Sequence, residues 1–484
     1  MGNGLAYLML AIWPAVCVAF FARLSLERAL IWSIIGAYML LPPITEFDLP
    51  LVPDMDKFSI PNVAVLLIIV AFLGLRPSFI PRHGITKLLV AAILLGTVIT
   101  VLTNSDPIKF LVRTDALPIE FSYGQLPGLR VLDTLSVLSS QIIMLIPFFL
   151  ARAYLSTDKG LRELMFAILL AGLIYTIPAL IEIRLSPQIN TWVYGFFQHN
   201  FLQMMREGGF RPIVFMPHAL WLALFFVMAL SAGAALVRAA EPKHRWRYLL
   251  ATFYLVVVLY LSKSQASQLY ALLLLPLILF GSATWQIRVA VVCALIAVIY
   301  PMLRGLGLVP LDLILAKAQA LDPARAQSLE YRFWNEEQLL ARAAEKPAFG
   351  WGGWGRNLER DPHTGEIATI PDGRWIIVFG TFGWMGYIAQ MGLVALPIAL
   401  VAWYKRKLPT VQMSPLIAPL CLMLGITMMD MLLNDTLVPM TWLLVGAILG
   451  YAERFAPERP GKKRPFPEGP AINRRHKPDR RTVL

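Results

Sequence analysis

Two arginines stand just ahead of an apolar run in the stretch REGGFRPIVFMPHALWLAL. They are Arg206 and Arg211, and His218 lies where the apolar run begins. A guanidinium group stays charged when it is partly removed from water, and it donates paired hydrogen bonds to phosphate oxygens. The pattern predicts a site for an anionic phosphate group at the mouth of a membrane cavity. Pairing of these arginines with Glu207 or with lipid headgroups is the alternative interpretation.

Two tryptophans lie in the turn FGWGGWG, within a polar segment that extends over residues 304–386. An indole face stacks readily on a sugar ring, so Trp351 and Trp354 are candidates for saccharide binding. Anchoring at the membrane–water interface is the alternative. Before the turn, Asp322 and Pro323 form a helix start, and the apolar stripe that follows predicts an amphipathic helix along the membrane surface.

Asp372 stands where this polar segment gives way to the next apolar run, between Pro371 and Gly373. A carboxylate held there can share a cavity with the arginines, which would keep it ionised and able to accept a proton. The alternative is that Asp372 caps the first turn of the next helix.

Two further cations lie in predicted connections on the same side. Lys263 occupies the turn LSKSQAS between two apolar segments, where it either binds substrate or extends its amine outward to water. Arg130 ends a predicted loop over residues 104–130.

The elements that must position these residues are membrane helices. Hydrophobic residues make up 57% of the 484 positions and charged residues 15%, a composition too apolar for a soluble chain. The sequence predicts an all-α, polytopic transmembrane helix bundle of 12 or 13 spans with a long periplasmic loop that contains amphipathic helices. The thirteen candidate spans cover residues 5–21, 29–41, 60–75, 85–103, 131–153, 161–183, 214–237, 248–261, 268–280, 289–303, 375–403, 415–433 and 437–451.

The eleventh span is unusually long, and Gly380-Thr-Phe-Gly383 is expected to break it into an interfacial piece and a span. The regions are then an N-terminal membrane bundle (1–303), a periplasmic loop (304–373), C-terminal spans (374–455) and a basic tail (456–484). The tail is rich in Pro, Lys and Arg, and it is expected to be disordered and cytoplasmic.

The charge pattern predicts the orientation. Connections rich in Lys and Arg follow every second span, so these connections are expected to face the cytoplasm. The N-terminus then lies outside and the C-terminus inside. The net charge of +13 reflects this orientation signal and the tail, and we expect no nucleic-acid partner. The first span lacks a basic n-region, so it is expected to stay in the protein. The three cysteines lie in apolar runs without metal-ligand spacing.

Three of these motifs, in this order, resemble the O-antigen ligase and polysaccharide polymerase superfamily of bacterial inner-membrane proteins. RPIVFMPH, which begins at Arg211, is similar to the family's outer-face arginine before a span. LSKSQAS is similar to its Ser-Arg turn, with Lys263 for arginine. The segment from Arg332 through PAFGWG to GWMG resembles its long periplasmic loop. The resemblance covers about residues 161–404.

The resemblance implies inverting glycosyl transfer, without a metal or other cofactor, from an undecaprenyl-pyrophosphate-linked saccharide to a saccharide or lipid A-core acceptor. Arg211 and Arg332 would stabilise the leaving pyrophosphate. Ligases of the family carry a histidine motif at the loop end, where this chain has PDGRW. Asp372 is the nearest replacement as base, and His363 is the second candidate. The other substrate-binding candidates are Lys263, His218, Arg206, Arg130, Trp351 and Trp354.

Polymerase and ligase activities both remain open, as do two other classes. The pair Asp54 and Asp56 in the first outward loop is typical of metal-dependent lipid-sugar glycosyltransferases, although a solvated acidic loop explains it as well. A polysaccharide-precursor transporter or flippase would need ionisable residues within its spans, and Asp430 is the candidate.

Overall fold

The chain folds into a bundle of α-helices, as its apolar segments predict. The computed structural model describes residues 2–49, 52–113, 121–206, 208–361 and 364–456. The helices are α1 (Gly4–Arg23), α2 (Leu26–Leu40), α3 (Ser59–Leu67) with its π-helical continuation η1 (Ile68–Phe72), α4 (Gly84–Leu102), α5 (Asp133–Tyr154), α6 (Asp158–Leu185), α7 (Ile189–Tyr194), the 3-10 helix η2 (Phe201–Met204), α8 (Ala219–Ala239), α9 (Pro242–Leu261), α10 (Gln265–Leu279), α11 (Ala283–Gly305), α12 (Leu311–Leu321), α13 (Pro323–Ala344), α14 (Arg374–Lys407), α15 (Ile417–Asp430) and α16 (Pro439–Glu453).

Each of the thirteen predicted apolar segments falls on a helix of the bundle. Within the described residues, seven helices are long and apolar enough to cross a membrane, namely α1, α4, α5, α6, α8, α11 and α14. Three shorter apolar helices, α3 with η1, α10 and α15, lie among them. The protein is therefore membrane-embedded and all-α, and the number of crossings stays a prediction.

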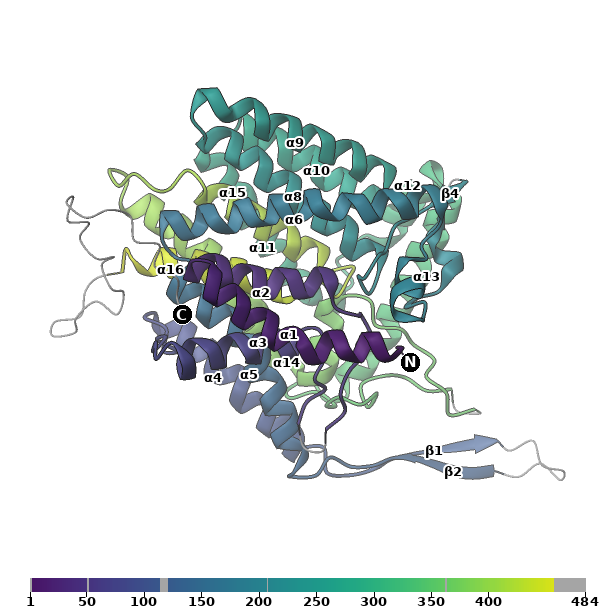
Figure 1. The fold of residues 1–484 in the computed structure, drawn as a ribbon. Helices are drawn as coiled ribbons and strands as arrows, with labels where there is room; N and C mark the ends of the chain where they lie inside the picture. Colours follow the sequence, from purple (N-terminus) through teal and green to yellow (C-terminus); the bar gives the residue numbers. More distant parts are fainter. Residues whose placement is uncertain (1, 50–51, 114–120, 207, 362–363, 457–484) are drawn as a thin grey trace.

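The bundle has two distinct ends (Figure 1). We name the end that carries residues 104–130, 184–218 and 306–373 the loop end, and the opposite end, where α16 finishes, the tail end. The N-terminus lies at the loop end, where the backbone N–H of Asn3 donates to the carbonyl of Tyr194 at 2.9 Å. The three segments that the sequence predicts to share one side of the membrane thus lie at one end of the molecule.

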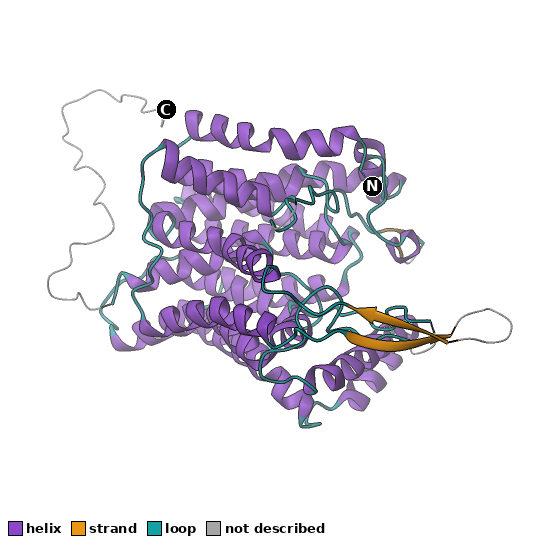
Figure 2. Cartoon of the chain, turned by 90° about the horizontal axis from the view of Figure 1, so that it is seen from below, coloured by secondary structure: helices purple, strands orange, loops and turns teal. Residues whose placement is uncertain are grey.

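A β-hairpin projects from the loop end (Figures 1 and 2). Strands β1 (Ile108–Arg113) and β2 (Phe121–Leu126) pair antiparallel within residues 104–130, where the sequence predicts a loop. A second, very short hairpin pairs β3 (Met205–Arg206) with β4 (Gly209–Phe210). It carries Arg206 and lies directly before Arg211.

Helix α8 is the central helix of the bundle. In its most apolar window 83% of the residues are buried, and it packs against α6, α9 and α10. A helix that is apolar on all sides fits only the interior of a bundle. Its N-terminus, capped by His218, is therefore fixed at the loop end by packing on every side.

Helix α14 is broken at Gly383, as the glycine pair predicts. Gly383 has φ +63° and ψ −164°, which is not helical. The turn at residues 347–352 fills the break: Trp351 N–H donates to the Gly380 carbonyl at 2.9 Å, and Trp384 N–H donates to the Pro347 carbonyl at 2.7 Å. These bonds satisfy backbone groups that a kink would leave without partners. They also fix the tryptophan-containing turn onto α14.

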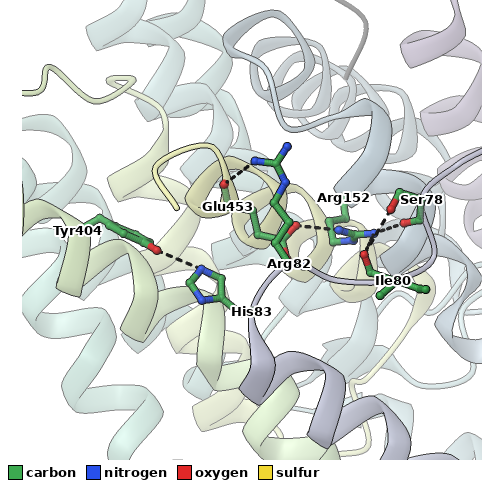
Figure 3. Close-up of polar contacts among 7 residues, drawn as sticks. All are labelled: Ser78, Ile80, Arg82, His83, Arg152, Tyr404 and Glu453. Atoms are coloured by element: carbon green, nitrogen blue, oxygen red, sulfur yellow. Dashed lines mark hydrogen bonds and ion pairs between the residues drawn. The ribbon is translucent and has the colours of Figure 1, made fainter. Parts of the chain in front are cut away.

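A buried ion pair holds the tail end together (Figure 3). Arg152 of α5 contacts Glu453 of α16 with 2.7 Å between Nη1 and Oε2, and their side chains are 2% and 0% exposed. The second carboxylate oxygen of Glu453 accepts from the backbone N–H of Arg82 at 2.7 Å. Arg152 also donates to the carbonyls of Ser78 and Ile80. The segment between η1 and α4 is thereby tied to α5 and α16.

Candidate active site at the loop end

Arg332 and Asp372 meet at the loop end. Arg332 lies on α13 and Asp372 lies two residues before α14, and 3.3 Å separates Arg332 Nε from Asp372 Oδ2. The Arg332 side chain is 23% exposed and that of Asp372 is 40% exposed, so both remain accessible to a ligand. Arg332 Nη1 also donates to the carbonyl of Leu433 at 3.3 Å, which orients the guanidinium group. Two of the predicted catalytic residues are therefore in direct contact.

Asp372 does not cap the helix that follows it. The N-cap position of α14 is Gly373, and its first turn receives no side-chain cap hydrogen bond. Gly373, and not Asp372, thus occupies the N-cap position, and an effect of Asp372 on the helix dipole stays a prediction. Burial raises the pKa of the Asp372 carboxyl above its ordinary value, and the charges of Arg332 and His199 offset part of that rise. The arginine was expected to keep this acid ionised; Arg332 does act in that direction, but desolvation has the larger effect on the pKa and makes the carboxylate a stronger base.

Arg211 and His218 flank the start of α8. The Arg211 residue is 7% exposed, and its backbone N–H donates to the Met204 carbonyl at 2.8 Å. His218 Nδ1 accepts from the backbone N–H of Leu220 at 3.0 Å, so the imidazole serves as the N-cap of α8.

Burial and nearby cationic groups both act on the His218 imidazole. Burial lowers the pKa of His218 to about 3, and the positive charges of His199, Arg211 and Arg332 add to the effect. The imidazole is therefore neutral at physiological pH, whereas the guanidinium groups keep their charge. A cluster of two arginines, one neutral imidazole and one carboxylate can hold an anion and accept a proton.

His199 and Asp430 belong to the same region, and the sequence did not indicate their place in it. The His199 and His218 rings lie 4.4 Å apart between centroids in an edge-to-face arrangement. Asp430 is buried at the end of α15, where its carboxylate accepts from Asn434 Nδ2 at 3.0 Å and Thr436 Oγ1 at 2.9 Å. These bonds fix the turn that presents the Leu433 carbonyl to Arg332. A carboxylate in an apolar run was the available signal for Asp430; a lone histidine in a polar loop gave none.

Lys263 and Arg206 contact each other near the site. Lys263 Nζ donates to the backbone carbonyl of Arg206 at 2.9 Å and ties the turn between α9 and α10 to the β3–β4 hairpin. Lys263 has φ +53°, an uncommon conformation for a residue other than glycine. Its contact supports a structural role, and substrate binding by either residue stays a prediction.

The two tryptophans have different environments. Arg342 lies over the Trp351 ring at 3.6 Å from the centroid and Lys346 lies over it at 4.5 Å. Trp351 Nε1 donates to the Arg342 carbonyl at 2.7 Å. Trp354, in contrast, is 58% exposed. The cations cover the face that Trp351 would offer to a sugar, so Trp354 is the better placed of the two.

Two adjoining cavities lie at the loop end, with volumes of about 530 Å³ and about 330 Å³, and neither Arg332 nor Asp372 lines them. They share Pro53, Asp54 and Ser140, and we name them together the acidic cleft. Trp354 and Arg130 line the larger cavity. Arg374, two residues after Asp372, and Trp221, in the first turn of α8, line the smaller one. The acidic cleft is thus connected to the predicted catalytic residues through the start of α14, which carries Arg374.

Asp54 and Asp56, the candidates for a metal-binding pair, have different hydrogen-bond partners and different exposure. Asp56 Oδ1 accepts from the backbone N–H groups of Phe58 and Ser59 at 2.9 and 2.8 Å, so it caps the start of α3. Asp54 is exposed and lines both cavities. In the part of the chain that the structure describes, no three His, Cys, Asp or Glu side chains are grouped so as to hold a metal ion. His363, the second candidate for the base, lies outside the described residues, as does the tail from residue 457 onward.

The sequence matches no model of a protein family and no curated protein. The functional interpretation therefore depends on the geometry of the loop end and on the motifs themselves.

Proposed function

We propose that this protein is a membrane glycosyltransferase that polymerises or ligates undecaprenyl-pyrophosphate-linked saccharides at the periplasmic face of the bacterial inner membrane. The acceptor hydroxyl attacks the anomeric carbon from the side opposite the pyrophosphate. The bond from that carbon to the phosphate oxygen breaks, its electron pair leaves with the pyrophosphate, and the hydroxyl proton passes to Asp372. The configuration at the anomeric carbon is thereby inverted.

One observation carries the proposal: the contact of Arg332 with Asp372, 3.3 Å apart at the loop end. A leaving pyrophosphate gains negative charge as its bond breaks, and preorganised guanidinium groups stabilise that charge. Two arginines at the end of an apolar bundle meet this need without a metal ion. The raised pKa of Asp372 suits the second need, acceptance of a proton from a sugar hydroxyl.

The test is transfer by the purified full-length protein in lipid nanodiscs, with a lipid-linked saccharide donor. Arg211→Ala and Arg332→Ala should each lose transfer, because the pyrophosphate charge is left without its partner at about 2–5 kcal/mol. Lysine at either position should restore activity only in part, since it keeps the charge and loses the paired donors. Arg28→Ala is the matched control, because Arg28 pairs with Glu163 at 2.8 Å at the opposite end. Full activity of either alanine variant at the loop end would remove that arginine from the site.

The proposed orientation has its own test in intact cells. The Glu345 side chain is 53% exposed at the loop end and that of Lys243 is 69% exposed at the tail end. Glu345→Cys should react with an impermeant thiol reagent from outside, and Lys243→Cys should react only after permeabilisation. The native cysteines are buried and should not interfere. The reverse labelling pattern would contradict a periplasmic active face.

A further inference from the structure

The acidic cleft has a charge opposite to that of the arginine cluster beside it. Five aspartates and two arginines line its two cavities. Both arginines are already paired, Arg374 with Asp435 at 3.2 Å and Arg130 with Asp133 at 3.8 Å. The remaining carboxylates, those of Asp48, Asp54 and Asp56, give the cleft a net negative charge. A phosphate or another anionic group is therefore repelled from it.

Trp354 is held at the wall of this cleft in a costly conformation. Its φ is +54°, in the left-handed region that residues with a Cβ rarely adopt. Between Gly353 and Gly355 it projects a side chain that is 58% exposed. Two residues before it, the N–H of Gly352 donates to the Thr381 carbonyl at 2.9 Å, so the chain that leads to Trp354 is bonded to α14.

The other lining groups suit an uncharged polar ligand. Carboxylates accept hydrogen bonds from hydroxyl groups, and the hydroxyls of Ser136 and Ser140 both donate and accept. Each cavity has the size of a small-molecule site, for which about 300–1,000 Å³ is usual. The cleft thus offers an aromatic face with hydrogen-bond acceptors around it, and its two arginines are already paired with aspartates. Such a lining matches the apolar faces and the hydroxyl groups of sugar rings.

We infer that the acidic cleft binds a neutral saccharide chain, stacked on Trp354, and that its aspartates select against sugars that bear carboxylate groups. This inference rests on the proposed function and deepens it. The lipid pyrophosphate is assigned to Arg211 and Arg332, and the saccharide to the acidic cleft, whose smaller cavity is lined by Arg374, two residues after Asp372. The anionic pyrophosphate and the neutral saccharide of one substrate would then bind to regions of opposite charge.

The experiment measures saccharide binding without any lipid-linked donor, on the purified full-length protein in nanodiscs. The probes are fluorescent neutral gluco- and manno-oligosaccharides and oligogalacturonates of equal length. The wild-type protein should bind at least one neutral probe and should bind the oligogalacturonates at least about tenfold more weakly. Trp354→Ala should weaken neutral binding by at least about tenfold. Trp334→Ala is the matched control, because Trp334 is 50% exposed on α13 and does not line the cleft. Asp54→Asn should narrow the difference between neutral and acidic probes.

Three results would overturn the inference: equal or tighter binding of oligogalacturonates, unchanged binding by Trp354→Ala, or no binding of any neutral probe. Size-exclusion profiles of the variants should match that of the wild type; if Trp354→Ala misfolds, Trp354→Phe keeps an aromatic face and should retain most of the binding. The proposed function fails separately. A protein that binds neutral saccharides in the cleft but does not transfer them retains this inference and loses the transferase assignment.

Discussion

Replacement of Asp372 by asparagine separates catalysis from stability. Asparagine keeps the shape and the hydrogen-bonding capacity of the side chain but cannot take up a proton at pH values where proteins fold. Because α14 is capped at Gly373 and receives no side-chain cap, its N-terminus does not depend on the carboxylate. We expect Asp372→Asn to insert and fold like the wild type while transfer is lost.

The expected magnitudes follow from the ion pair. Two unit charges 3.3 Å apart attract by about 5 kcal/mol at an effective dielectric constant of about 20. Because the Asp372 side chain is 40% exposed, solvent screening reduces the net contribution of the pair to about 1 kcal/mol or less. General-base catalysis contributes about 10²–10⁴-fold, or about 3–5 kcal/mol. The loss in kcat should therefore far exceed the loss in unfolding free energy.

The assay is kcat for saccharide transfer as a function of pH, together with thermal unfolding of the same samples. In the wild type, activity should fall as the pH drops through the pKa of Asp372. Burial raises that pKa, so the fall should begin at a higher pH than for an exposed aspartate. The asparagine variant should show low activity without this dependence. Glu345→Gln is the control, since it breaks the nearby Arg342–Glu345 pair of 2.9 Å outside the site.

Near-normal kcat in Asp372→Asn would refute the assignment of Asp372 as the base. If His363→Ala then lost activity, the base would be His363 instead. Equal losses in Asp372→Asn and Glu345→Gln would show that any disturbed ion pair at the loop end lowers activity, and the catalytic interpretation would fail.

Three further predictions concern stability, each measured by thermal unfolding of the purified protein. Burial raises the pKa of Glu336 on α13 from 4.5 to about 7. The stability that the protonated carboxyl contributes is therefore complete below pH 4.5 and is lost as the pH rises through about 7. Glu336→Gln should raise the free energy of unfolding at pH 8 by up to about 3 kcal/mol and leave it unchanged at pH 4. Gly383→Ala should destabilise by at least about 2 kcal/mol, because φ is +63° and a Cβ would lie 2.5 Å from the Ala348 carbonyl carbon. Arg152→Ala should cost about 3–5 kcal/mol, because it leaves Glu453 buried without its partner.

Each of these has a matched comparison within the chain. Glu345→Gln, at an exposed carboxylate, should change stability equally at both pH values. Gly353→Ala should be tolerated, since a Cβ there meets nothing within 4 Å. Lys159→Ala, which breaks an exposed pair of 2.8 Å with Glu27, should cost no more than about 1 kcal/mol. If the exposed and buried ion pairs proved equal in cost, the importance given to the Arg152–Glu453 contact would be wrong.

The helix positions could be predicted because an apolar run of about 20 residues in a membrane protein folds as a helix, which satisfies all its backbone hydrogen bonds internally. The break in α14 was also predictable, since Gly380 and Gly383 interrupt such a run. The β1–β2 hairpin was not, because its strands are only six residues each and lie in a polar segment without a clear alternating pattern.

The sequence predicted which residues belong to the candidate site, but it did not predict which of them are in contact. Arg332 and Asp372 came from separate motifs, and only the packing of α13 near α14 shows that they touch. The covering of Trp351 by Arg342 depends on the conformation of the turn, which sequence spacing does not specify. The membership of His199 likewise follows from a ring contact that no local pattern encodes.

The break at Gly383 gives α14 two lengths with different surroundings. Residues 384–403 rise about 30 Å at 1.5 Å per residue, which matches the hydrocarbon thickness of a bilayer. Before the break, the carbonyls of Gly380 and Thr381 accept from the N–H groups of Trp351 and Gly352 at 2.9 Å each. Residues 384–403 accommodate a bilayer that thickens or thins by tilting. Because the bonds at the break join protein groups to each other, the position of the 347–352 turn against α14 is insulated from the lipid composition of the membrane.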